Sequence, residues 1–61
     1  MTMLFEYYNQ EQNFITYVAQ SNKGFAVGIL DLDANQYLGA IKIFKDLLPA
    51  KEYAQKCATF N

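Results

Sequence analysis

Residues 14–44 read FITYVAQSNKGFAVGILDLDANQYLGAIKIF, and this stretch decides the fold. It contains three runs rich in β-branched and aromatic residues, which predict strands over 14–20, 25–32 and 37–44. The runs are separated by SNKG (21–24) and DANQ (33–36). Asn, Asp and Gly tolerate the backbone angles of tight turns, so both segments predict hairpins and an antiparallel meander.

The flanking segments complete one compact domain over residues 1–61. MLFEYY (3–8) predicts a further strand, which the polar loop 9–13 joins to the meander. At the other end, Asp46 is a predicted N-cap, and helical spacing of small apolar residues follows it. We therefore predict an α+β fold: a four-stranded antiparallel β-meander with one C-terminal helix packed on one face.

The predicted hairpin pairs assign the side chains to two faces of the sheet. The first turn pairs Ala19 with Ala26 and Tyr17 with Gly28, and the second pairs Leu30 with Gly39. One face then has small residues at its centre, and we expect the small helix residues to dock there. This face comprises Ile15, Tyr17, Ala19, Ala26, Gly28, Leu30, Leu32, Tyr37, Gly39, Ile41 and Ile43.

The opposite face is predicted to lack a helix, and it is mostly apolar. An exposed apolar patch marks an interaction site, so we expect it to be covered by a second copy of the chain, by a host protein, or by residues 1–13 folded back. The candidate interface consists of Phe14, Val18, Phe25, Val27, Ile29, Asp31, Leu38, Lys42 and Phe44.

Charge and length exclude several classes of function. The net charge is −1 and the five lysines are scattered with no arginine, so a phosphate-binding stripe is weak. No apolar run approaches the roughly 18 or more residues of a membrane span, and the N-terminus lacks the basic region of a signal peptide. The single cysteine fits a reducing cytoplasm, where we expect the protein to act.

The motif DLDANQ (31–36) resembles the start of a calcium loop but lacks its other requirements. Counting from Asp31, the sixth position is Gln36 instead of glycine, and the twelfth is Lys42 instead of glutamate. Cys57 has no histidine to act as its base. We therefore predict that DLDANQ is a turn and that the protein is not an enzyme and has no metal or cofactor.

The segment FKDLLPAKEYAQKC (44–57) follows the last strand with the pattern L-x-x-A-x-x-Y-A. A meander ending in this way resembles many small prokaryotic and phage proteins, including the N-terminal domain of HicB-type antitoxins. Where that family has D-L-P-G after its second strand, this chain has DLDA.

These observations predict a small non-catalytic protein–protein interaction module. It would act by occupying the surface of a partner, as an inhibitor, an antitoxin-like protein or a phage-encoded antagonist does. The five tyrosines support this reading, since tyrosine is enriched at binding surfaces. The alternative is a nucleic-acid-binding β-sheet module, in which sheet aromatics stack on bases.

Overall fold

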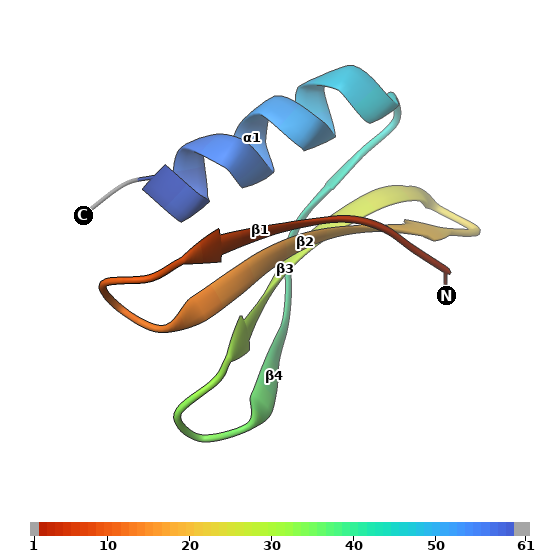
Figure 1. The fold of residues 1–61 in the computed structure, drawn as a ribbon. Helices are drawn as coiled ribbons and strands as arrows, with labels where there is room; N and C mark the ends of the chain where they lie inside the picture. Colours follow the sequence, from red (N-terminus) through yellow and green to blue (C-terminus); the bar gives the residue numbers. More distant parts are fainter. Residues whose placement is uncertain (1, 60–61) are drawn as a thin grey trace.

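The computed structural model describes residues 2–59 as one four-stranded antiparallel sheet with a helix across one face (Figure 1). This confirms the predicted α+β architecture. The strands lie side by side in chain order and are followed by the helix. The elements are β1 (Thr2–Asn9), β2 (Phe14–Ser21), β3 (Gly24–Asp31), β4 (Gln36–Phe44) and α1 (Leu47–Thr59).

The β2–β3 hairpin has the predicted register, with Ala19 opposite Ala26 and Tyr17 opposite Gly28. The Tyr17 ring lies across Gly28, because a Cβ atom built on that glycine would collide with the tyrosine hydroxyl. Glycine is thus required at position 28, where it makes room for an aromatic ring on the same face.

The β3–β4 register differs from the prediction only next to the turn, because the predicted alignment is kept from Phe25–Phe44 to Val27–Lys42. Leu30 pairs with Tyr37 instead of Gly39, and Asp31 pairs with Gln36, so the turn begins one residue earlier than predicted. The cause is local: Asp31 Oδ1 accepts hydrogen bonds from the turn amides of Asp33 (3.0 Å) and Ala34 (3.4 Å), which closes the loop directly after Asp31. Irregular pairing beyond the turn includes Gly39, whose φ is +87°.

The predicted helix face was wrong. The helix packs Ala50 and Ala54 against Val18 and Val27, on the face that we expected to be bare, and all four are fully buried. Small residues on both layers would leave a gap, whereas alanines against valines fill the space between helix and sheet. On the other face, the Tyr17 ring occupies the space above Gly28. Partly buried aromatic side chains pack around this contact: Phe5, Tyr7, Phe25 and Phe44 from the strands, and Tyr53 from the helix itself.

Two buried hydrogen bonds fix the helix on the sheet. The Thr16 hydroxyl of β2 donates to the Ala54 carbonyl at 2.8 Å, and the Asn9 amide at the end of β1 donates to the Ala58 carbonyl at 2.7 Å. Asn9 Oδ1 also accepts the amide of Gln12, so this side chain joins the β1–β2 loop to the end of the helix. Sequence reasoning treated Asn9 only as a loop residue.

Replacing Ala54 with leucine should destabilise the protein by about 1–3 kcal/mol, because three extra carbon atoms overpack a contact that is fully buried. Gln55→Leu is the matched control, since Gln55 is exposed on the same helix. Urea unfolding monitored by circular dichroism measures the free energy of unfolding of both variants. Equal stabilities for the two variants would show that the helix does not dock through Ala54.

Thr16→Val should lower the free energy of unfolding by about 1 kcal/mol, because it keeps the side-chain shape but removes the bond to Ala54. Tyr7→Phe is the contrasting variant. The Tyr7 hydroxyl is buried without a hydrogen-bond partner among the described residues, so its removal should leave stability unchanged or slightly raised. A loss for Tyr7→Phe as large as that for Thr16→Val would contradict this assignment.

Candidate interaction surfaces

The face of the sheet turned away from α1 has no element packed on it within residues 2–59 (Figure 1). We call it the helix-free face. Strand alternation and the observed register place Glu6 of β1 on this face. Lys42, which is the one lysine within the strands, lies on the helix side. The apolar members of the helix-free face are Met3, Tyr8, Ile15, Tyr17, Ala19, Ala26, Leu30, Tyr37, Ala40, Ile41 and Ile43, of which Ile41 lies in the irregular part of the β3–β4 pairing.

The centre of the helix-free face is covered by its own side chains, and the apolar exposure is concentrated on β4. Ala19 and Ala26 are buried, and the Tyr17 ring packs edge-on against Tyr37 at 5.7 Å between centroids. By contrast, Tyr37, Ile41 and Ile43 of β4 are 58%, 44% and 49% exposed. Because β4 is an edge strand, its outer backbone groups have no neighbouring strand among the described residues.

The residues of the predicted interface are divided among three environments. Val18 and Val27 are buried beneath the helix, and Phe25 and Phe44 pack at its margin, so none of these four forms a free surface. Lys42 extends over the rings of Phe44 and Tyr53. The remaining four line a groove: Phe14, Ile29, Asp31 and Leu38. The alternative cover, residues 1–13, is also wrong, since residues 2–9 form the edge strand β1.

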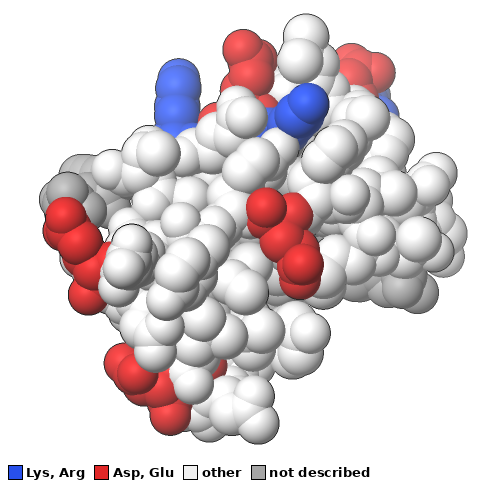
Figure 2. Space-filling model, in the orientation of Figure 1, with Lys and Arg blue, Asp and Glu red and all other residues white. Residues whose placement is uncertain are grey.

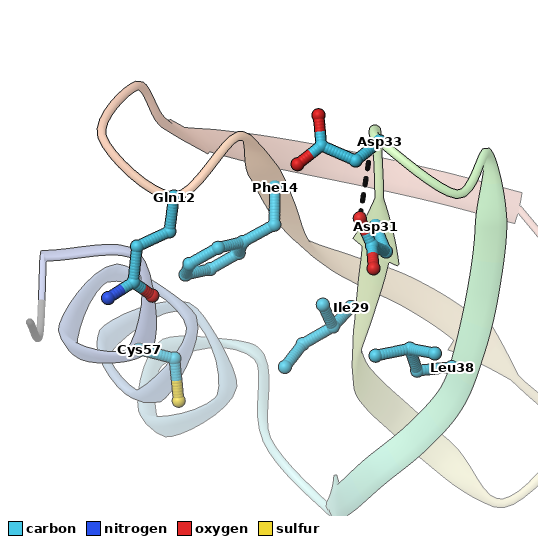
Figure 3. A pocket seen from close by; sticks show the side chains of 7 residues that line it. All are labelled: Gln12, Phe14, Ile29, Asp31, Asp33, Leu38 and Cys57. Atoms are coloured by element: carbon cyan, nitrogen blue, oxygen red, sulfur yellow. Dashed lines mark hydrogen bonds between the residues drawn. The ribbon is translucent and has the colours of Figure 1, made fainter.

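The groove lies between the C-terminal half of α1 and the β3–β4 hairpin and has a volume of about 510 Å³ (Figure 3). Phe14, Ile29 and Leu38 project into it from three strands, and Cys57 projects from the helix on the opposite side. Polar side chains stand at its rim: Gln12, Asp31 and Asp33. The groove therefore combines an apolar interior with two carboxylates at one margin.

Asn13 links the β1–β2 loop, to which it belongs, to the β3–β4 loop at the same end of the sheet. Its backbone has φ +55°, a left-handed conformation that asparagine tolerates better than most residues. Its side-chain amide donates to Asp33 Oδ1 at 2.7 Å. Its Oδ1 accepts the Tyr8 hydroxyl at 3.0 Å, and its carbonyl accepts the amide of Leu32 at 3.1 Å. Sequence reasoning missed this role, although an asparagine just before a strand is a recognisable turn signal.

The geometry of DLDANQ is that of a turn. Asp31 accepts amides of its own loop and Asp33 accepts the Asn13 amide, so both carboxylates contribute to local backbone structure. Within residues 2–59, no group of three acidic, cysteine or histidine side chains is placed to hold a metal ion. In the same part of the chain, no helix has the length and hydropathy needed to cross a membrane.

No family model matches the chain, and neither the curated proteins nor the solved structures include a significant match to it. The resemblance to HicB-type antitoxins therefore stays a prediction, and no residue role is transferred from that family.

Asp31→Ala should destabilise the protein by about 1 kcal/mol, because the turn loses the acceptor of two amides, whereas Asp31→Asn should retain most of the stability. Millimolar calcium should leave the melting temperatures of the wild type, Asp31→Ala and Asp31→Asn unchanged. A calcium-dependent rise of several degrees in the wild type, lost in Asp31→Ala, would show that the loop binds the ion after all.

Proposed function

We propose that this chain is a small non-catalytic protein-binding module that occupies a partner surface with its helix-free face. The observation that carries the proposal is the row of exposed apolar residues on β4: Tyr37, Ile41 and Ile43. Removing such side chains from water is the main driving force of protein association. An inhibitor or antagonist of the antitoxin or phage type is one form that such a module takes, and its free thiol suits a reducing cytoplasm.

The size of the surface supports a protein partner. A standard interface buries about 800 Å² on each side. The accessible surface of this chain is 4206 Å², so such an interface would occupy about a fifth of it. The two longest dimensions of the molecule are 30 and 20 Å, so one broad face is of that order. Tyrosine side chains often contribute strongly to the binding energy of protein interfaces. Tyr8 and Tyr37 are both more than half exposed on the helix-free face.

Charge separates this proposal from nucleic-acid binding. The strands contain one lysine, Lys42, and it lies on the helix side over Phe44 and Tyr53. In the view of Figure 2, the visible lysines gather along the edge where α1 lies, and most of the remaining surface is uncharged. Aromatic rings without neighbouring cations suit a protein surface better than a phosphate backbone.

The helix-free face also supports self-association when no partner is bound. A second copy offers the same apolar surface, and symmetric dimers are the commonest oligomers. The irregular pairing and the positive φ of Gly39 interrupt the β4 edge, which limits open-ended strand addition. We therefore expect a discrete dimer, in competition with the partner, instead of a fibre.

The double variant Ile41→Lys with Ile43→Glu tests the proposal, because it places charges on the helix-free face without touching the helix contact. Light scattering should detect a dimer for the wild type and a folded monomer for the double variant. Immobilised wild type should retain a protein from a lysate of the source organism that the double variant does not retain. Leu48→Glu, which changes a 65% exposed residue on the helix, is the control and should behave as the wild type.

Two results would contradict the proposal. One is retention of the same proteins by the wild type and the double variant. The other is a wild type that stays monomeric at millimolar concentration and retains no protein. Retention that disappears after nuclease treatment or at high salt would favour the nucleic-acid alternative, since phosphate contacts weaken steeply with salt.

A further inference from the structure

The groove between α1 and the β3–β4 hairpin is separate from the helix-free face, because Ile29 and Leu38 project to the helix side of the sheet (Figure 3). Its apolar lining is incompletely covered: Leu38 is 57% exposed, and Phe14 and Ile29 are only partly buried. The groove volume is about 510 Å³, which lies within the range of specific ligand sites. The groove is thus large enough to take a bulky side chain from another molecule.

The charge at the rim indicates which molecules fit. Asp31 and Asp33 line the β3–β4 margin of the groove, and Asp33 is exposed. Each uses its Oδ1 atom in the hydrogen bonds of the loops, and no described hydrogen bond involves Oδ2. The charged residues among those that line the groove are both acidic. Acidic groups are also visible at the free end of the β3–β4 hairpin in Figure 2.

None of the five lysines is among the residues that line the groove, and the contacts of three of them place them away from it. Lys42 and Lys51 extend over aromatic rings, at 5.4 Å from the Tyr53 centroid and 4.7 Å from the Phe5 centroid respectively. Lys23 belongs to the β2–β3 turn, at the opposite end of the strands from the β3–β4 loop. The two rim carboxylates are therefore available to a cation from outside the chain.

We propose that this groove binds a peptide segment of another protein that carries a large apolar side chain next to a lysine or arginine. The apolar side chain enters between Leu38 and Cys57, on the floor made by Phe14 and Ile29. The neighbouring cation pairs with Asp31 and Asp33 at the rim. Burial of the apolar group supplies most of the affinity, and the carboxylates select basic over acidic segments. This site is independent of the helix-free face.

Selection from a random heptapeptide display library tests the proposal. Against immobilised wild type, the enriched peptides should contain a large apolar residue within two positions of lysine or arginine. Leu38→Asp should weaken binding of an enriched synthetic peptide about tenfold or more, because it places a third carboxylate where the apolar group enters. Asp33→Asn keeps the oxygen that accepts the Asn13 amide, and loss of its charge should weaken binding about two- to fivefold.

Two controls locate the site. Leu48→Asp, at the other end of the helix, and the double variant Ile41→Lys with Ile43→Glu should bind the peptide as the wild type does. Bound peptide should also slow the reaction of Cys57 with a maleimide severalfold, since the thiol lies in the groove wall. Circular dichroism establishes that each variant is folded before its binding is compared.

Three results would overturn the proposal: no enrichment from the library, enriched peptides without basic residues, or equal binding by the wild type and Leu38→Asp. Peptides that lose binding in the Ile41/Ile43 double variant alone would belong to the helix-free face. That outcome would refute the groove site while supporting the proposed function, so the two failures are distinguishable.

Discussion

The structure depends on the contact between two alanines of α1 and two valines at the centre of the sheet. Ala50 and Ala54 bring the helix backbone close to Val18 and Val27, and none of the four is exposed to water. This close approach also brings the Ala54 carbonyl within reach of the Thr16 hydroxyl. Alanines contribute little apolar area themselves, so the aromatic side chains packed around this contact supply much of the buried surface.

One helix can cover only one face of the sheet, so the apolar side chains of the other face must be shielded from water in another way. Part of the solution is internal, since Tyr17 lies over Gly28 and against Tyr37. Apart from this contact of Tyr37, the outer strand β4 has no such cover and keeps its large apolar side chains largely in water. A chain of 61 residues has a small core and a single cysteine, so the free energy gained by covering β4 with a partner would be a large addition to its stability.

The groove is a second consequence of docking a straight helix on a twisted sheet. The β3–β4 hairpin turns away from the C-terminal end of α1, which leaves Leu38 and Cys57 facing each other across open space (Figures 1 and 3). The two loops that border the groove are held together by Asn13. The molecule therefore has two chemically different surfaces: a nearly uncharged sheet face, and a narrower apolar groove with an acidic rim.

The sequence by itself determined the elements, their order, the antiparallel meander and the register of the β2–β3 hairpin, because these follow from local patterns of β-branched residues, turns and helical spacing. Only the tertiary structure decided which face the helix covers. Both faces are apolar, so the alternation of side chains separates them but does not indicate which one the helix covers. The choice depends on packing: Ala54 fits better against Val18 on one face than against Tyr17 on the other. The turn of the β3–β4 hairpin was likewise decided by hydrogen bonds of Asp31, which shift it by one residue, and irregular pairing then restores the predicted alignment from Val27–Lys42 onward. The groove could not be predicted because its walls, Leu38 and Cys57, meet only when the helix has docked.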